Sequence, residues 1–581
     1  MSHARTPPSA GIPAPGYGPP GPPAPPGQPK PRRRRTIIVI VTVAALVVVL
    51  GGGAAGYLLL RTAGSPQQTA ASYLAGWQRG DYPAMDQVSV NVPRGGLASP
   101  LREYAAQLGQ RTLHTRLGPV TSSGGTATAQ FTAAVTMASG HTWTYHGQLS
   151  LVDRNRRWWV SWSPAAVYPG LRSGEHFALS AVWPARAAIL AADGTTQLSS
   201  PAMQAQSGSL QLLTGTVVAA TKAQAKALGA PYQAGDQIGA GGIEQSYQAQ
   251  LAGRPSLTIA VEGPGKHVDK AAARFPAVPG KPVRTSIDMQ MQMAASAAVS
   301  SAATSKPIDM VVTQPSTGKV LAVVERPGGF DRALEGIFPP GSTFKVVTAS
   351  GLAEKGMTPS STVQCPSTAD LGGRVFHNDD NEHLGTTNLQ TAFAVSCNTT
   401  FAMLASERLG GPALAAMART FGFNAQANLG IPATLGHFTT PHQPVDLAAD
   451  AFGQGTDLVN PLSQATVAAA IEDGTWRPPL LVTDPMPKQT ATPHKLSAAI
   501  LNTLRPMMRA VVTSGTAATV GFGPGVYGKT GTAQYGNGKN SHGWFIGYRG
   551  DLAFAVLVEG GGFGADSAGP VAKAFLSRVA G

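Results

Sequence analysis

Cysteine is scarce in this sequence, whose 581 residues include only two, Cys365 and Cys397. No spacing of cysteine and histidine is of the kind that holds zinc, which argues against a structural zinc site. The loop at 377–383 is rich in histidine and carboxylates, and we interpret it as a solvated loop rather than a metal site. The two cysteines permit a disulfide in an oxidising compartment, but a small buried thiol at Cys397 fits the sequence equally well. Neither a metal nor a cofactor is expected.

Charge is absent from residues 36–60, a run of about 25 residues that is long enough to span a bilayer. A basic block formed by Lys30 and residues 32–35 comes directly before it. A cleaved signal peptide is the alternative, but its apolar core has only about 7–15 residues and usually lies nearer the start of a chain. Because positive charges stay on the cytoplasmic side, we expect a single-pass protein of the cell membrane, with residues 1–35 inside and the catalytic part outside.

Acidic residues are fewer than basic ones, 30 against 44, and part of the net charge of +14 belongs to that basic block. No nucleic-acid partner is expected. The hydrophobic content of 43% is ordinary for globular proteins, which excludes general disorder. Residues 1–35 are the exception, because their proline and glycine predict a disordered tail. The length predicts three or four domains.

Two modules without recognisable chemistry are predicted after the membrane span. In residues 65–165, Ser65-Pro66 is typical of a helix start, and apolar residues follow at helical spacing. The pattern then changes to a period of two, which predicts an α+β cone of one helix and curved antiparallel strands with tryptophan in its core. Residues 175–285 mix short helices and strands, and we interpret them as a second non-catalytic module.

Residues 286–581 begin and end with strands and have helices between them. The expected elements are a helix at 289–302, a hairpin of 310–313 and 320–324, a largely helical stretch to about 515, strands at 526–534, 543–548 and 552–558, and a last helix at 570–579. This order predicts a single antiparallel sheet that is closed by the two ends of the segment and backed by helices.

The segment around Ser342 combines a nucleophile with a base. Pro339-Pro340-Gly341 predicts a turn, after which a helix is expected to run to Lys355, with Gly356 beyond its end. Ser342 and Lys345 are three residues apart, so on a helix they share one face and the amine can reach the hydroxyl. A serine hydroxyl reacts only when a base takes its proton, and lysine serves as that base only where burial or charge lowers its pKa.

Two further motifs strengthen the interpretation of Ser342 and Lys345 as catalytic residues. Ser396-Cys397-Asn398 follows in the chain, and Lys529-Thr530-Gly531-Thr532 lies near the C-terminus. Serine and lysine three apart are common by chance, but the three motifs in this order are typical of penicillin-binding proteins and class A β-lactamases. Together they predict an acyl-transfer site.

With these motifs the chain resembles the class B penicillin-binding proteins, the membrane-anchored D,D-transpeptidases of peptidoglycan synthesis. Further similar stretches lie at 339–345, 396–401, 453–455, 460–462, 514–517, 528–534 and 543–545. The resemblance implies a multidomain α+β protein: a serine penicillin-recognising transpeptidase fold at 286–581, a dimerisation-type pedestal at 175–285, and at 65–165 a nuclear-transport-factor-like extension, as in the methicillin-resistance transpeptidase branch. The pedestal signature of many relatives is reduced here to Arg186-Ala187 and Asp193-Gly194.

The resemblance also implies a role for each motif residue. Ser342 would attack the D-Ala-D-Ala donor stem, Lys345 would be its base, Ser396 would relay a proton, and Asn398 would hold Lys345 and the donor amide. Lys529, Thr530 and Thr532 would bind the donor carboxylate, and Gly531 would leave room for the substrate along the strand. The backbone N–H groups of Ser342 and Thr532 would form the oxyanion hole.

Partners and alternatives follow from the same resemblance. The expected partners are donor and acceptor stem peptides, β-lactam antibiotics and proteins of a cell-wall synthesis complex. A D,D-carboxypeptidase or β-lactamase would pass the acyl group to water, and no glutamate is placed to hold that water. A β-lactam sensor would carry a zinc-protease motif, and no His-Glu-x-x-His occurs. No glycosyltransferase module is found before the pedestal, so sugar polymerisation is not expected.

Overall fold

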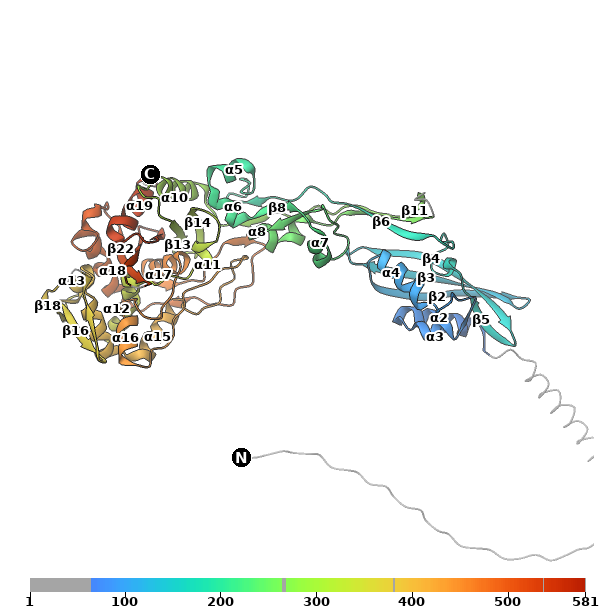
Figure 1. Cartoon of the computed structure of the whole chain (residues 1–581), viewed down its shortest axis with the longest axis horizontal. Coiled ribbons are helices and arrows are strands. Elements are labelled where there is room, and N and C mark those ends of the chain that lie inside the picture. The colour runs from blue at the N-terminus through green and yellow to red at the C-terminus, as the bar shows by residue number, and fades with distance from the viewer. Residues whose placement is uncertain (1–63, 264–267, 380–381, 537, 580–581) are drawn as a thin grey trace, which may run out of the picture. The chain divides into compact units, whose positions relative to one another are not determined.

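The computed structural model describes residues 64–263, 268–379, 382–536 and 538–579 (Figure 1). The predicted membrane span at 36–60 and the predicted tail at 1–35 lie outside these residues. Within the part that is described, no helix is both long and apolar enough to cross a membrane. The chain divides into two compact units, and the second contains everything from Ser163 onwards.

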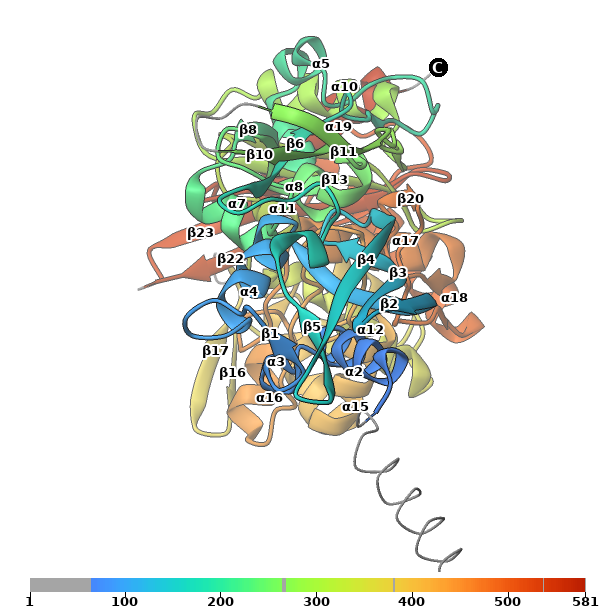
Figure 2. The same ribbon diagram turned by 90° about the vertical axis from the view of Figure 1, so that its right-hand side faces the viewer.

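The N-terminal module begins with a helix whose start is specified by the sequence. Ser65 caps α2 (Pro66–Arg79): its hydroxyl accepts the Gln68 N–H, and the Gln68 side chain accepts the Ser65 N–H. The strands that follow form one sheet in the order β1-β5-β4-β3-β2 (Figure 2). The other elements are α3 (Tyr82–Asp86), β1 (Ser89–Val90), α4 (Ala98–Gln107), β2 (Gln110–Ser123), β3 (Thr126–Met137), β4 (Thr142–Arg154), β5 (Arg157–Ser161) and η1 (Pro164–Ala166).

The strands of this module have the predicted period of two. Along β4, exposed and buried residues alternate from Thr142 to Leu151. Trp77 packs edge-on against Phe131 with ring centroids 5.9 Å apart, and Trp143 lies 4.4 Å from Tyr145. These tryptophans belong to the core, as the sequence predicts.

The pedestal combines a three-stranded antiparallel sheet, in the order β11-β10-β6, with short helices. Arg186 anchors one of these helices, because its guanidinium contacts the Glu244 carboxylate at 2.5 Å and donates to the Glu244 carbonyl at 2.9 Å. Two short helices meet at Tyr247, α8 (Gly242–Ser246) and α9 (Gln248–Ala252), and the Gln248 side chain accepts the Gly239 N–H. The remaining elements are β6 (His176–Val182), β7 (Ile189–Leu190), α5 (Pro201–Gln206), α6 (Gly208–Thr214), β8 (Thr216–Ala219), α7 (Lys222–Leu228), β9 (Gln237–Ala240), β10 (Ser256–Glu262), β11 (Val268–Phe275) and β12 (Val283–Thr285).

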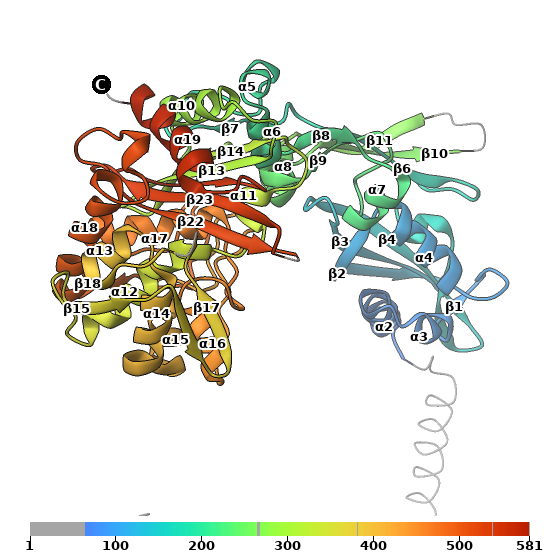
Figure 3. The same cartoon turned by 60° about the vertical axis from the view of Figure 1, so that its left-hand side comes forward.

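A five-stranded antiparallel sheet, in the order β14-β13-β24-β23-β22, organises the C-terminal domain. Its strands are β13 (Ile308–Gln314), β14 (Lys319–Arg326), β22 (Tyr527–Tyr535), β23 (Asn540–Tyr548) and β24 (Ala553–Val558). Helices α10 (Met289–Ser300) and α19 (Gly564–Arg578) pack on one face and α17 (Pro461–Asp473) on the other (Figure 3). The predicted sheet closed by both ends of the segment is confirmed, and β22 is its edge strand.

The segment between β14 and β22 is mainly helical, but the sequence prediction overlooked three small two-stranded sheets among its described residues. In the first, β16 pairs with β17 around Gly372 and Gly373, which both have positive φ. In the other two, β15 pairs with β18 and β19 pairs with β21. The elements are α11 (Arg332–Glu335), η2 (Gly341–Phe344), α12 (Lys345–Glu354), β15 (Thr362–Cys365), β16 (Thr368–Leu371), β17 (Arg374–His377), β18 (Gly385–Asn388), α13 (Leu389–Ala394), α14 (Asn398–Leu404), η4 (Ala405–Leu409), α15 (Gly410–Thr420), α16 (Pro444–Asp450), β19 (Thr475–Trp476), β20 (Val482–Asp484), β21 (His494–Lys495), α18 (Ala498–Thr513) and η5 (Ala518–Val520).

The last helix begins earlier than the sequence suggests. Helix α19 starts at Gly564, and Pro570, where the helix was expected to start, lies inside it. Gly564 permits this start because it packs directly on the sheet: a Cβ atom there would lie 2.2 Å from the Trp544 carbonyl oxygen. The first turn of α19 is therefore held against β23, next to the edge strand.

Candidate active site

Ser342 lies in a short 3₁₀ turn, η2, rather than at the start of a regular α-helix as predicted. Gly341 has φ +55°, and a Cβ atom there would lie 2.6 Å from the Thr532 carbonyl oxygen. Its N–H donates to the Gly453 carbonyl at 2.9 Å. Only glycine fits this position, because both the backbone conformation and the close approach of β22 exclude a side chain. The turn therefore holds Ser342 against the edge strand.

Lys345 is the first residue of α12 and is completely buried. Its Nζ lies 2.8 Å from Ser342 Oγ, as the three-residue spacing predicts. The same nitrogen contacts Asn398 Oδ1 at 2.5 Å, the Ser396 carbonyl oxygen at 2.6 Å and Ser396 Oγ at 3.1 Å. Four oxygen atoms thus surround a single amine.

Val395, Ser396 and Cys397 connect α13 to α14, whose first residue is Asn398, and the backbone at Ser396 is unusual. Ser396 has φ +68°, a left-handed value that is rare for serine and often found at functional sites. Cys397 forms a disulfide with Cys365 in β15, which answers the question that the sequence left open. The Asn398 side chain also donates to the His377 carbonyl at 3.2 Å, so its two ends hold two different segments.

Lys529 extends from the edge strand β22 towards Ser396. Its Nζ donates to Ser396 Oγ at 2.9 Å and to the Thr530 carbonyl at 3.0 Å, and the side chain is completely buried. The Ser396 hydroxyl therefore lies between the amines of Lys345 and Lys529. The five side chains predicted to be catalytic meet in one place, although they come from three separate segments of the chain.

Burial lowers the pKa of both lysines. The pKa of Lys345 lies well below its ordinary value, mainly because burial disfavours the charged amine and also because the Lys529 charge is near. Burial alone lowers the pKa of Lys529 to about 7. A neutral Lys345 has two N–H donors, which match the Ser396 carbonyl and Asn398 Oδ1, and one lone pair for the Ser342 hydroxyl. The geometry thus suits a neutral base.

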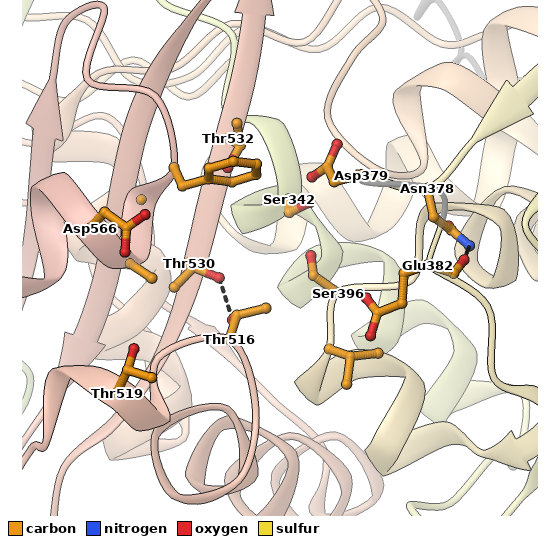
Figure 4. Close-up of a pocket in the computed structure, with 14 residues that line it drawn as sticks. Ser342, Asn378, Asp379, Glu382, Ser396, Thr516, Thr519, Thr530, Thr532 and Asp566 are labelled. Carbon is orange, nitrogen blue, oxygen red and sulfur yellow. Dashed lines mark hydrogen bonds between the residues drawn. The ribbon is translucent and has the colours of Figure 1, made fainter.

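A cleft of about 650 Å³ opens above these side chains, with Ser342 and Ser396 at its base (Figure 4). Thr530 and Thr532 line one wall, where Thr530 Oγ1 and Thr516 Oγ1 are 2.6 Å apart. Lys345 and Lys529 are buried beneath the lining rather than part of it. The serine and threonine hydroxyl groups thus line the cleft, whereas the two lysine amines lie beneath this lining.

Gly531 is also required for packing within the domain. A Cβ atom there would lie 2.9 Å from the Pro340 carbonyl oxygen, 2.9 Å from Thr343 Cγ2 and 3.0 Å from Trp544 Cβ. These atoms belong to the turn of the nucleophile and to the neighbouring strand. This glycine makes room for the segment that carries Ser342. That it also leaves room for substrate along the strand stays a prediction.

Several residues of the cleft were missed as site residues by the sequence analysis. They are Asn378, Asp379, Glu382, Val395, Thr516, Thr519, Phe563, Gly564, Ala565 and Asp566. The loop at 377–383 was interpreted as solvated, yet Asp379 and Glu382 face the cleft. Only Thr516 had a signal in the sequence, because it lies in the family-like stretch at 514–517.

Comparison with known sequence families matches three consecutive parts of the chain. Residues 65–175 match the NTF2-like N-terminal transpeptidase domain, residues 204–285 the penicillin-binding protein dimerisation domain, and residues 309–577 the penicillin-binding protein transpeptidase domain. The chain belongs to the class B penicillin-binding proteins. This confirms the family resemblance stated from the motifs, including the nuclear-transport-factor-like extension, and all five of the side chains that meet beneath the cleft lie in the transpeptidase match.

Similarity to named relatives and to a solved structure supports this family assignment. The chain is 31% identical over 325 residues to peptidoglycan D,D-transpeptidase PbpA of Mycolicibacterium smegmatis, and 29% identical over 323 residues to PbpA of Mycobacterium tuberculosis. Each match covers 46% of this chain and 65% of the relative, so the chain spans less than two thirds of their length. The structure of Pseudomonas aeruginosa PBP2 in complex with WCK 5153 superposes with a TM-score of 0.58 at 25% identity, covering 69% of this chain and 96% of that one.

Proposed function

We propose that this penicillin-binding protein is a D,D-transpeptidase that cross-links peptidoglycan stem peptides through an acyl-enzyme on Ser342, and that β-lactams acylate the same serine. The observation that carries the proposal is the contact of Lys345 Nζ with Ser342 Oγ at 2.8 Å, beside Ser396, Asn398 and Lys529. Relatives with the printed name peptidoglycan D,D-transpeptidase support it. A serine acyl-enzyme divides acyl transfer between two amines into two easier steps.

In the first step, Ser342 Oγ attacks the carbonyl carbon of the penultimate D-Ala while its proton passes to neutral Lys345. The oxyanion that forms is stabilised by the backbone N–H groups of Ser342 and Thr532, an interaction that typically contributes about 3–4 kcal/mol to lowering the barrier. The C–N bond then breaks. The leaving amine takes a proton from the Ser396 hydroxyl, which regains one from the Lys345 ammonium. Terminal D-Ala leaves, and Lys345 is neutral again.

In the second step, the acceptor amine attacks the Ser342 ester and gives up a proton through Ser396 to Lys345. The new amide bond forms, the ester C–O bond breaks, and Ser342 Oγ recovers its proton from Lys345. During the first step Lys529 supplies positive charge near the donor carboxylate, which later leaves with terminal D-Ala, and Thr530 and Thr532 offer hydroxyl donors on the wall of the cleft. Thr516 extends this row of hydroxyls.

Reaction of the full-length protein in detergent with a stem pentapeptide ending in D-Ala-D-Ala and with an acceptor amine tests the proposal. We expect release of D-Ala together with a new cross-linked amide. Water competes with the acceptor amine for the Ser342 ester, and Glu382 is a carboxylate in the cleft that could hold this water. The cross-linked and the hydrolysed peptide should therefore both be counted by mass spectrometry. Hydrolysed peptide without any cross-link, over a range of amine concentrations, would favour the carboxypeptidase alternative.

The acylation rate is expected to depend on pH with a bell shape. Lys345 must be neutral to accept the proton, so the rate rises as the pH rises through its lowered pKa. Lys529 must be charged to bind a carboxylate, and its pKa is about 7, so the rate falls again at higher pH. The measurement is the second-order rate of labelling by a chromogenic cephalosporin from pH 5 to 10. A rate that falls steadily with pH would contradict a neutral lysine base.

Replacement of Lys529 by alanine is expected to slow acylation by one to two orders of magnitude, because the carboxylate loses the positive charge beneath the cleft. Ser396 also loses one of its two amine contacts. Lys573, an exposed lysine on α19 that donates to the Val520 carbonyl, offers a matched control, Lys573→Ala. Acylation kinetics of Lys529→Ala that equal those of the unchanged protein would refute the carboxylate role.

The proposal also includes a membrane anchor, which lies outside the described residues, and a protein partner. We propose a single-pass anchor at 36–60, supported by its uncharged run and the basic block before it, with the catalytic domain outside the cell membrane. Solved structures with the same fold are titled as a complex of PBP2 with MreC from Helicobacter pylori and as part of a peptidoglycan synthase complex. We propose that this chain likewise has a partner protein in a cell-wall synthesis complex.

A further inference from the structure

The backbone carbonyl of Thr532 is held by a side chain that the mechanism above does not use. Thr532 lies on the edge strand β22, opposite Gly543 of β23. Its carbonyl oxygen accepts a hydrogen bond from the Gln454 side-chain amide at 3.2 Å. Gln454 comes from the turn that follows α16, and it is not one of the described residues that line the cleft. The contact therefore reaches the edge strand from behind the active site.

The position of this contact shows which way the Thr532 N–H points. In an antiparallel strand the N–H and C=O groups of one residue point to the same side, and β22 has a neighbouring strand on one side only. A Cβ atom on Gly341 would lie 2.6 Å from the Thr532 carbonyl oxygen, so this carbonyl faces the turn beside Ser342. The Thr532 N–H then points away from β23 and towards the same turn. An oxyanion donor must point in this direction.

The turn that carries Gln454 is fixed to the segment of the nucleophile. The Gly453 carbonyl accepts the Gly341 N–H at 2.9 Å, and a Cβ atom on Gly453 would lie only 1.9 Å from the Gly341 carbonyl oxygen. The Ala451 carbonyl accepts the hydroxyl of Thr348, on helix α12, at 2.7 Å. The backbone of this turn is thus bound to η2 and α12, while the Gln454 side chain holds β22.

We infer that Gln454 is a positioning residue for acylation: by holding the Thr532 carbonyl, it fixes the Thr532 N–H relative to the Ser342 N–H, the two donors of the proposed oxyanion hole. The inference rests on the proposed function. Without this hydrogen bond the strand is less restrained at Thr532, and its N–H is less well aimed at the oxyanion. Hydrogen bonds weaken with distance and misalignment, so the developing negative charge is stabilised less.

Other contacts keep the edge strand near the turn when the Gln454 bond is absent. The Trp544 indole on β23 donates to the Pro339 carbonyl at 3.0 Å, and Gly531 packs against the Pro340 carbonyl. Neither contact involves the Thr532 carbonyl. Loss of the Gln454 amide is therefore expected to change the aim of one N–H group while the domain stays folded. The reaction step should suffer and the initial binding of a β-lactam should not, because only the transition state carries the oxyanion.

Gln454→Met tests this inference, because methionine fills a similar volume but has no N–H donor. Acylation of the full-length protein in detergent by a chromogenic cephalosporin is followed by stopped flow over a range of concentrations. This separates the dissociation constant of the initial complex from the acylation rate constant. We expect the rate constant to fall by about 10- to 100-fold and the dissociation constant to stay within about twofold. Gln443→Met, at the exposed start of α16, is the matched control and should change neither value.

A boronic acid gives a second readout of the same geometry. Its boron atom bonds to Ser342 Oγ, the serine proton passes to Lys345, and the tetrahedral adduct places an oxygen where the oxyanion would lie. The affinity of phenylboronic acid should therefore fall in Gln454→Met by about the same factor as the acylation rate constant. Gln454→Glu keeps the shape of the side chain but has no N–H donor when ionised. It should show the same two losses, and it replaces the methionine variant if that variant does not fold.

Three outcomes would overturn the inference. The first is an acylation rate constant in Gln454→Met that equals that of the unchanged protein. The second is a loss confined to the dissociation constant, which would make Gln454 a residue of substrate binding. The third is a lower thermal unfolding midpoint and a smaller fraction of protein that is acylated, with the rate constant of that fraction unchanged, which would show a structural role only. If the unchanged protein itself is not acylated, the proposed function fails instead.

Discussion

Ser342→Ala is expected to abolish covalent labelling of the protein by fluorescent penicillin. The β-lactam carbonyl needs an oxygen nucleophile within reach of a base. Of the two serine hydroxyls among the described residues of the cleft, that of Ser342 lies nearer to Lys345 Nζ, at 2.8 Å against 3.1 Å for Ser396. Ser396, the other serine at the base of the cleft, contacts both amines. Alanine removes the reacting atom but keeps the turn, because Gly341 and the backbone contacts hold it. Labelling is read by fluorescence after denaturing electrophoresis.

A matched control lies on the helix that follows. Ser350 is also buried, but its hydroxyl donates to the Val346 carbonyl of its own helix at 2.7 Å and faces no cleft. Ser350→Ala should keep full labelling, and both variants should have nearly the same thermal unfolding midpoint as the unchanged protein. Label that persists in Ser342→Ala would place the nucleophile elsewhere, and mass spectrometry of the labelled peptide would show whether Ser396 has taken its place.

The contact between Ser342 and Lys345 could be predicted from the sequence because it is local. A spacing of three residues places side chains together in any helical turn, whether 3₁₀ or α. The meeting of Ser396 and Lys529 with this pair is different, since no periodicity relates segments that are distant in the chain. It was predicted only because the three motifs together resemble a family, and the distances of 2.9 and 3.1 Å around Ser396 Oγ come from the fold.

Two features could not be predicted for identifiable physical reasons. The disulfide requires Cα atoms within reach, and the 6.2 Å separation of Cys365 and Cys397 depends on the pairing of β15 with β18, which the sequence analysis missed. The role of Gly531 depends on which segment packs against β22, and that segment proved to be the nucleophile turn.

Lys345→Arg is expected to slow acylation by about a thousandfold, the range in which general bases contribute. Arginine keeps a positive charge and hydrogen-bond donors for the Ser396 carbonyl and Asn398, but its guanidinium does not become neutral in proteins. Lys345, in contrast, is buried beside Lys529, and its lowered pKa makes the neutral amine accessible. The measurement is the second-order rate of acylation by a chromogenic cephalosporin, followed by stopped flow.

Lys355→Arg provides the matched control, because Lys355 follows the same helix but is exposed at its end. It should leave the acylation rate unchanged. Since a larger buried guanidinium can disturb packing, Lys345→Met is measured beside it: methionine fills a similar space without charge and also lacks a basic nitrogen. We expect both replacements at 345 to be slow and to lose the rise of rate with pH. A fast Lys345→Arg variant that kept this rise would show that another group removes the proton, and Lys529, joined to the site through Ser396 Oγ, would then be the base to test.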